Sequence, residues 1–191
     1  MHIPLALASL IFIATAEARI GETSLQFVDR YGAPKDTQSN KISDKSHPLV
    51  EGAIHHTYEY QGWTIRAAFL QLDGPAVRMD YQKSIVAGVN PRIQDYELEA
   101  IAAANTSAGT SWARVEVTNP NVSQLNIPGR FFQQTVSDAI GEKMWRRSDG
   151  ATLWLRPGGM FVRLELPAAG EYEAQLKAAK EQKSRASVPS F

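Results

Sequence analysis

Apolar residues alternate with polar ones from Ile54 to Tyr81, which is the period of a β-strand that buries one face. Turn residues at Gln61-Gly62 and Asp73-Gly74-Pro75 divide this stretch into three strands. The predicted apolar face consists of Tyr58, Tyr60, Trp63, Ile65, Ala67, Phe69, Val77, Met79 and Tyr81. The pattern therefore predicts an antiparallel meander with one face on a hydrophobic core.

The lengths of the two turns predict which residues face each other across this meander. A two-residue first turn places Tyr60 opposite Trp63. A three-residue second loop places Phe69 opposite Met79, and both registers keep the apolar set on one face.

A second set of short β segments lies near the C-terminus. The turn sequences Ser148-Asp149-Gly150 and Pro157-Gly158-Gly159 separate three segments, at 143–147, 151–156 and 160–166. They predict a second three-stranded meander.

A predicted helix precedes each meander. The first runs from about Ser24 to Tyr31, behind a capping box of Thr23 and Gln26, and places Leu25 and Val28 on one face. The second runs from about Asp95, its predicted cap, to Ala104.

These segments predict an α+β fold in which two α-β-β-β units form antiparallel sheet with helices packed on one side. Lys35–Pro48 is expected to be a loop, Trp112–Val117 alternates like a strand, and Phe132–Ile140 fits a short helix. The predicted single domain covers 19–183, with repeats at about 19–84 and 93–167, a C-terminal helix at 170–183 and a flexible tail at 184–191.

The first 18 residues have the pattern of an export signal. The apolar run Ile3–Ala16 leads into Ala16-Glu17-Ala18, a small-x-small cleavage site, so the mature chain is expected to begin at Arg19. A membrane anchor is the alternative, but the run is shorter than the ~20 residues that span a bilayer. No later stretch is long and apolar enough to span a bilayer. We therefore expect an exported protein, periplasmic or secreted, without a membrane span.

Composition excludes several function classes. Lys plus Arg and Asp plus Glu each number 20, so the chain lacks the basic excess that nucleic-acid binding requires. There is no cysteine, which excludes disulfides, thiolate metal sites and a cysteine nucleophile, and which suits a bacterial periplasm. The sequence contains no G-x-G-x-x-G or phosphate-binding loop, so no cofactor is expected.

The opening of the predicted mature chain carries a family resemblance. Ile20-Gly21-Glu22-Thr23, then Val28, then Tyr31-Gly32-Ala33-Pro34 resembles the pattern I-G-x-[ST], a hydrophobic position and [LYF]-G-x-P. That pattern opens the first helix in small outer-membrane assembly lipoproteins of the SmpA/BamE type and in β-lactamase-inhibitor-like (BLIP-like) proteins. Uncharacterised bacterial secreted proteins share it. The match covers about fifteen residues and the order of elements.

This resemblance implies a helix followed by a β-meander. Similarity to the inhibitor family implies a non-catalytic protein that binds another protein with a sheet face. Similarity to the assembly lipoproteins implies an envelope partner, but those proteins are anchored through an N-terminal cysteine, which this sequence lacks.

The candidates for catalysis or metal binding are His47, His55 and His56. Adjacent residues on a strand point to opposite faces, so His55 and His56 are not expected to share a metal site. No G-x-S-x-G sequence marks a nucleophile. We therefore predict neither catalytic nor metal-binding residues. A small exported hydrolase that uses these histidines is the alternative.

One cluster in the second meander favours binding. Two-residue turns would place Trp145 opposite Trp154 and Trp154 opposite Arg163, with Arg156 beside Phe161 on the same face. Trp and Arg together are typical of interaction hot spots. The alternative is that the row packs internally, with cation–π contacts worth ~0.5–1 kcal/mol each.

The sequence thus predicts a non-enzymatic exported binding module. Its predicted partner-binding residues are Trp145, Trp154, Arg156, Phe161 and Arg163. The expected partner is another envelope or secreted protein, with a glycan as the less favoured choice. A purely structural envelope component is a third possibility.

Overall fold

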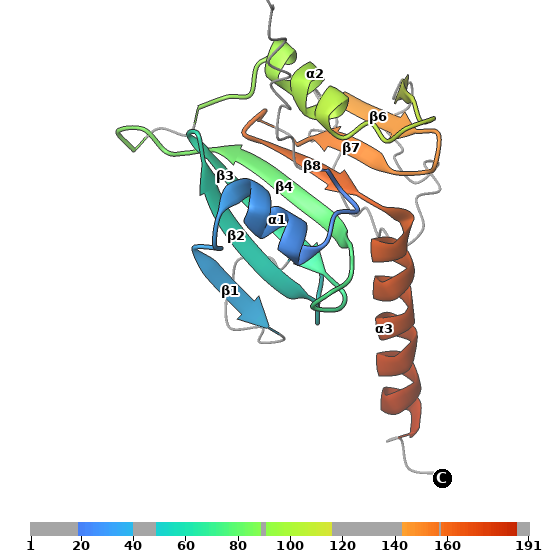
Figure 1. The fold of residues 1–191 in the computed structure, drawn as a ribbon. Helices are drawn as coiled ribbons and strands as arrows, with labels where there is room; N and C mark the ends of the chain where they lie inside the picture. Colours follow the sequence, from blue (N-terminus) through green and yellow to red (C-terminus); the bar gives the residue numbers. More distant parts are fainter. Residues whose placement is uncertain (1–18, 40–48, 89–90, 116–142, 157, 187–191) are drawn as a thin grey trace, which may run out of the picture.

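The computed structural model describes residues 19–39, 49–88, 91–115, 143–156 and 158–186. Within these residues the fold is α+β, with one eight-stranded antiparallel sheet and three helices (Figure 1). The predicted export signal, His47 and the predicted helix at 132–140 lie outside the described residues.

Among the described residues, each of the first two helices is followed by four strands, where the predicted α-β-β-β units contain three. The elements of the first half are α1 (Ser24–Tyr31), β1 (Asp36–Ser39), β2 (Ile54–Tyr60), β3 (Trp63–Phe69) and β4 (Ala76–Lys83). Those of the second half are α2 (Asp95–Ala104), β5 (Trp112–Val115), β6 (Lys143–Arg147), β7 (Thr152–Leu155) and β8 (Phe161–Glu165), after which comes α3 (Pro167–Ala186). The extra strand of the first half is β1, which lies in a stretch predicted to be loop. In the second half the additional strand is β5, which lies in the stretch Trp112–Val117 that alternates like a strand.

The strand order in the sheet is β1-β2-β3-β4-β8-β7-β6-β5. The two meanders therefore meet through an antiparallel pairing of β4 with β8, in which Met79 lies opposite Leu164 and Tyr81 opposite Val162. One continuous hydrophobic core lies against both halves of the sheet. It includes Phe27 of α1 in the first half and Leu153 of β7 in the second.

Helix α1 has the predicted bounds and the predicted capping box, in which the Thr23 side chain accepts from Gln26 N. The expected buried face is wrong, however. Leu25 is 69% exposed, whereas Phe27 is fully buried against the rings of Tyr58 and Phe69.

Helix α2 also has the predicted bounds, but its N-cap is Gln94 and not Asp95. The Gln94 backbone N–H donates to Glu97 Oε2 at 2.7 Å, which satisfies one of the free donors at the helix start. Asp95 instead pairs with Lys143 of β6.

The predicted strand registers have three outcomes. Tyr60 lies opposite Trp63, as predicted from the first turn. Phe69 opposite Met79 is wrong, because Met79 pairs with Ala67 and a register shift pairs Phe69 with Ala76. Met79 and Tyr81 keep the predicted apolar face, whereas Val77 lies in the core cluster on the opposite side of the sheet. Trp145 opposite Trp154 is wrong by one residue, because Trp145 pairs with Leu153.

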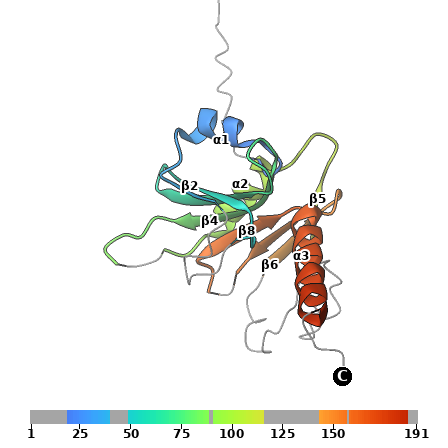
Figure 2. The same ribbon diagram turned by 90° about the horizontal axis from the view of Figure 1, so that it is seen from below.

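The two faces of the sheet are covered differently. Helices α1 and α2 cover one face, which we call the helical face (Figure 2). Helix α3 begins against the other face, which we call the second face, and then extends beyond the sheet (Figures 1 and 2). The prediction from the sequence that all helices pack on one side of the sheet is therefore wrong. Helix α3 also starts before residue 170 and continues past 183.

A buried arginine holds α3 to the second face. Arg78 Nε donates to Glu165 at 2.9 Å, and its terminal nitrogens donate to Glu173 of α3 at 2.7 and 2.9 Å. The same guanidinium donates to the carbonyl of Leu49. Because Arg78 is 4% exposed, these acceptors compensate its charge in place of water.

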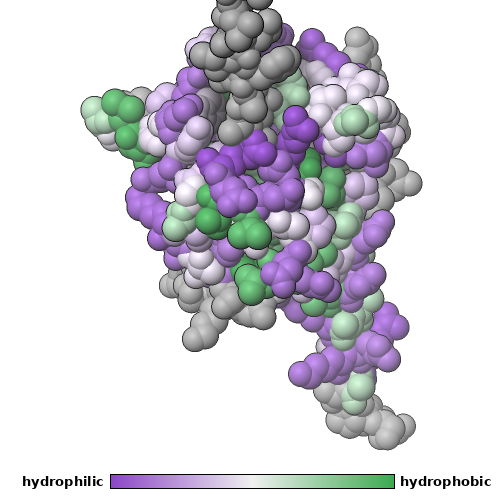
Figure 3. All heavy atoms as spheres, in the orientation of Figure 1, coloured by the Kyte–Doolittle hydropathy of each residue, from purple (hydrophilic) through white to green (hydrophobic). Residues whose placement is uncertain are grey.

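The visible surface is mostly hydrophilic, with separate hydrophobic patches (Figure 3). Within the part of the chain that the structure describes, no helix is both long and apolar enough to cross a membrane.

Candidate functional site

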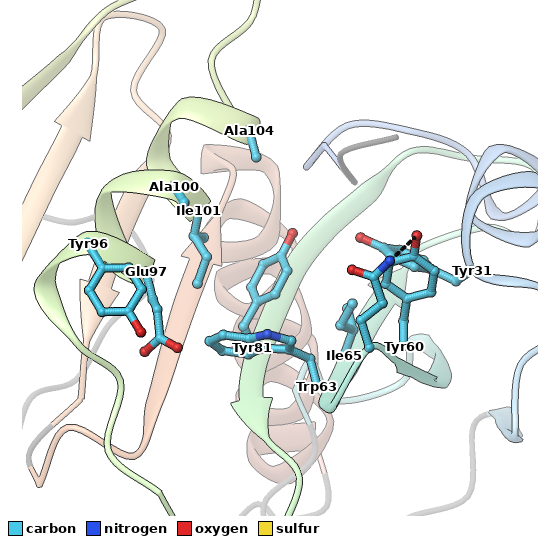
Figure 4. Close-up of a pocket in the computed structure, with 11 residues that line it drawn as sticks. Tyr31, Tyr60, Trp63, Ile65, Tyr81, Tyr96, Glu97, Ala100, Ile101 and Ala104 are labelled. Atoms are coloured by element: carbon cyan, nitrogen blue, oxygen red, sulfur yellow. Dashed lines mark hydrogen bonds between the residues drawn. The ribbon is translucent and has the colours of Figure 1, made fainter. Parts of the chain in front are cut away.

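A pocket of about 350 Å³ opens on the helical face, between α2 and the β2–β3 hairpin (Figure 4). Most of the side chains around it are aromatic or small. They are Tyr31, Tyr60, Gln61, Trp63, Ile65, Tyr81, Tyr96, Glu97, Ala100, Ile101 and Ala104. We call this the aromatic pocket.

The tight β2–β3 turn positions one wall of the aromatic pocket. Gln61 and Gly62 have φ values of 48° and 80°, as in the type I′ turns that join twisted antiparallel strands. This turn sets Tyr60 opposite Trp63 on the helical face. Gln61 Nε2 donates to the Tyr60 hydroxyl at 3.1 Å (Figure 4).

The floor of the pocket comes from the centre of the sheet. Ile65 of β3 lies opposite Tyr81 of β4. The Tyr81 hydroxyl accepts from Nδ2 of Asn105 at 3.4 Å and is hydrogen-bonded to Tyr31. Burial raises the pKa of Tyr81 to about 12, and burial also raises the pKa of Tyr31. Both tyrosines are therefore neutral hydrogen-bonding groups at neutral pH.

Helix α2 supplies the opposite wall and, among the described residues that line the pocket, the one carboxylate. Glu97 Oε1 pairs with Lys83 Nζ at 2.7 Å, and Glu97 Oε2 accepts from Gln94 N at 2.7 Å. Lys83 Nζ also lies 5.9 Å from the centroid of the Trp63 ring. The pocket thus combines aromatic surface with a carboxylate whose charge is already compensated.

The predicted partner-binding residues lie on both faces of the sheet. Trp145 packs against the core of the helical face. Trp154 lies opposite Arg163 on the second face, as predicted, and Arg156 lies beside Phe161, to whose carbonyl its N–H donates at 3.0 Å.

The four residues on the second face form an internally paired cluster. Trp154 is only 4% exposed, and the Arg156 guanidinium lies 4.4 Å from the centroid of its ring. Arg163 makes two 2.7 Å hydrogen bonds to the carboxylate of Asp80. A partner-binding role for these residues stays a prediction.

The histidines do not join the aromatic pocket. His56 is buried on the helical face, with Nδ1 3.0 Å from the Tyr58 hydroxyl. The neighbouring histidine, His55, accepts at Nε2 from the Val50 N–H at 3.3 Å. Burial lowers the pKa of both. Among the described residues no group of three or more metal-ligating side chains is present.

Sequence reasoning placed Tyr60, Trp63, Ile65 and Tyr81 on one apolar face but assigned all four to the core. It missed Tyr31 and the residues of α2 as parts of a site, because the local pattern of 95–104 does not show where on the sheet that helix packs. The small side chains Ala100 and Ala104 on α2 are the one signal in the sequence, since they leave room beside the sheet.

Comparison of the chain with family models, curated proteins and solved structures finds no match. Function must therefore be argued from the site itself.

Proposed function

We propose that this protein is a non-enzymatic binding module of the bacterial envelope or extracellular space, and that its ligand enters the aromatic pocket. The observation that carries this proposal is an open pocket of about 350 Å³ that combines five aromatic side chains with a few polar groups. Small-molecule sites have this composition, because apolar surface supplies affinity and a few polar groups fix orientation.

The chemistry of the pocket favours binding over catalysis. The tyrosine hydroxyls of its floor stay protonated, and Glu97 is held by Lys83 and by the start of α2. A general acid or base needs a pKa near the working pH and access to a reacting proton. The described histidines lie elsewhere, which argues against the alternative of a histidine-dependent hydrolase.

The predicted signal at 1–18 supports a periplasmic or secreted location for this activity. We also infer that the two halves of the chain are repeats of one unit. The support for this is that each half has one helix followed by a four-stranded meander. In both halves the strands also lie in chain order from the edge of the sheet, at β1 and β5, to its centre, at β4 and β8. The open aromatic pocket favours a binding module over the alternative of a purely structural envelope component.

The test compares two matched variants of α2. Ala100→Phe fills the aromatic pocket, whereas Ala103→Phe puts the same side chain on an exposed position of the same helix outside it. A mixed panel of neutral and charged small molecules and short peptides is added to the full chain, and the indole N–H signal of Trp63 is followed by NMR.

We expect at least one class of compound to shift the Trp63 signal in the wild type and in Ala103→Phe, and not in Ala100→Phe. Mass spectrometry of the bound compound should show it chemically unchanged. A Trp63 signal that no compound moves, or a bound compound that is converted to product, contradicts the proposal.

A further inference from the structure

The charged groups at the aromatic pocket are already paired within the protein. Glu97 carries the carboxylate of the pocket, and Lys83 neutralises it at 2.7 Å. Both side chains are largely buried, with 20% and 15% of Lys83 and Glu97 exposed. A charged ligand would have to give up its hydration without finding an opposite charge, which is costly. The pocket therefore suits a neutral ligand.

The floor of the pocket is mostly aromatic and apolar. Trp63, Ile65 and Tyr81 lie between the wall formed by α2 and the wall that carries Tyr60 (Figure 4). An aromatic floor of this kind favours a ligand that has one apolar face and can stack on a ring.

The walls offer both donors and acceptors of hydrogen bonds. Each Glu97 oxygen has two lone pairs, of which the contacts to Lys83 and Gln94 use one. Gln61 has a second N–H and a carbonyl oxygen besides the N–H that binds Tyr60. The hydroxyl of the 70% exposed Tyr96 can both donate and accept.

This mixed set separates the neutral candidates. A hydroxyl group donates to the Glu97 oxygens and accepts from Gln61, so a polyhydroxylated ring satisfies both walls. A proline-rich peptide brings carbonyl acceptors and few N–H groups, so the Glu97 oxygens would face acceptors. A quaternary amine brings no hydrogen-bonding group, and its charge would meet an already neutralised carboxylate.

We propose that the aromatic pocket binds a neutral saccharide, with the C–H face of one pyranose ring on Trp63 and the ring hydroxyls on Glu97 and Gln61. This assignment rests on the proposed function and names its ligand class. The volume of about 350 Å³ lies at the small end of the ~300–1,000 Å³ range of small-molecule sites, which suits one or two sugar rings.

The experiment titrates the full chain with neutral mono- and disaccharides of glucose, galactose, mannose and their N-acetyl derivatives. Decaproline and tetramethylammonium are the competing probes. The indole N–H signals of all four tryptophans are recorded, so that Trp112, Trp145 and Trp154 serve as internal controls. We expect at least one saccharide to shift Trp63 alone in a saturable manner.

Three variants test the assigned contacts, each checked for folding by circular dichroism. Ala100→Phe should abolish saccharide binding, and Ala103→Phe should leave it unchanged. Glu97→Gln should weaken it about tenfold, because a hydrogen bond to a charged acceptor is stronger than one to a neutral acceptor.

The remaining outcomes separate this inference from the proposed function. If decaproline or tetramethylammonium shifts Trp63 and no saccharide does, the ligand class is overturned and the binding function stands. If no probe or panel compound shifts Trp63, both are overturned. Saccharide binding that persists in Ala100→Phe contradicts the location of the site.

Discussion

Residue chemistry makes the fold sensitive to acid at His56. This side chain is 6% exposed and lies between the rings of Tyr58 and Phe69. Burial lowers its pKa below the ordinary value of 6.5, so the unfolded chain binds a proton more readily than the folded protein. The contribution of neutral His56 to stability is therefore complete above pH 6.5 and is lost as the pH falls below that value.

Urea unfolding at about pH 7.5 and about pH 5 measures this effect. We expect the wild type to be less stable at the lower pH, and we expect His56→Gln to reduce the difference. His55→Gln is measured in parallel, because burial also lowers the pKa of His55. This second variant gives the part of the pH difference that His55 contributes. A pH difference that is undiminished in His56→Gln would show that His56 does not carry the effect.

Trp154 distinguishes a structural role from a partner-binding role. The ring is 4% exposed beneath the Arg156 guanidinium, so Trp154→Ala removes a buried side chain and should cost about 3–5 kcal/mol of unfolding free energy. Urea unfolding measures this cost. Arg156→Ala removes the cation and leaves the ring in place, and should cost about 1 kcal/mol. A folded Trp154→Ala protein of wild-type stability that has lost a binding partner would instead support the interaction surface predicted from the sequence.

At the scale of elements, a glycine lies close to the docked helix α3. Gly52 has φ +78°, and a Cβ there would lie 2.9 Å from the Tyr172 hydroxyl of α3. Gly88 has φ +77°, but among the described residues, its own chain neighbours apart, no atom lies within 4 Å of such a Cβ. Both alanine variants carry the strain of a positive φ, whereas Gly52→Ala must also displace Tyr172.

We therefore expect Gly52→Ala to destabilise the protein by about 1–3 kcal/mol more than Gly88→Ala, the range that overpacking costs. Thermal unfolding measures the difference. Hydrogen exchange should show faster exchange in the first turns of α3 in Gly52→Ala alone. Equal stabilities of the two variants would mean that Tyr172 moves aside without loss.

Element boundaries could be predicted from the sequence where local chemistry decides them. The Thr23 capping box defines α1, and the Gln61-Gly62 turn fixes the register of β2 against β3. The position of Trp145 could not be predicted, because the β6–β7 loop holds three residues where two were expected. The Arg147 N–H donates to Ala151 O at 2.7 Å, which leaves 148–150 as the loop. One extra residue moves Trp145 to the other face.

The aromatic pocket shows the same limit for the candidate site. A period of two identifies which residues share a face, but it does not distinguish a covered position from an open one. The difference depends on where α2 packs, and long-range contacts decide this. Asn105 is fully buried, and its Oδ1 accepts a hydrogen bond from the Ile20 N–H at 2.8 Å, 85 residues away in the sequence. Local pattern contains no information on such a contact.

At the scale of the whole molecule, the two meanders depend on each other. Strand β4 has β3 on one side and β8 on the other, and Asp80 of β4 binds Arg163 of β8 with two 2.7 Å hydrogen bonds. The hydrophobic core is continuous across this pairing, since Met79 and Tyr81 lie in one cluster with Val162 and Leu164. Separating the halves would expose this apolar surface and the hydrogen-bonding edge of β4.

A chain that ends at Gly88 tests this dependence. We expect residues 19–88 alone to give no cooperative urea transition, whereas 19–191 gives a single one with coincident circular dichroism and fluorescence signals. The physical reason is that a chain as short as 19–88 has only marginal stability even when its core is fully buried. In the shortened protein, part of the core surface would also face water. A cooperative transition in the short chain would show that each half folds independently, so that the β4–β8 pairing joins two finished domains.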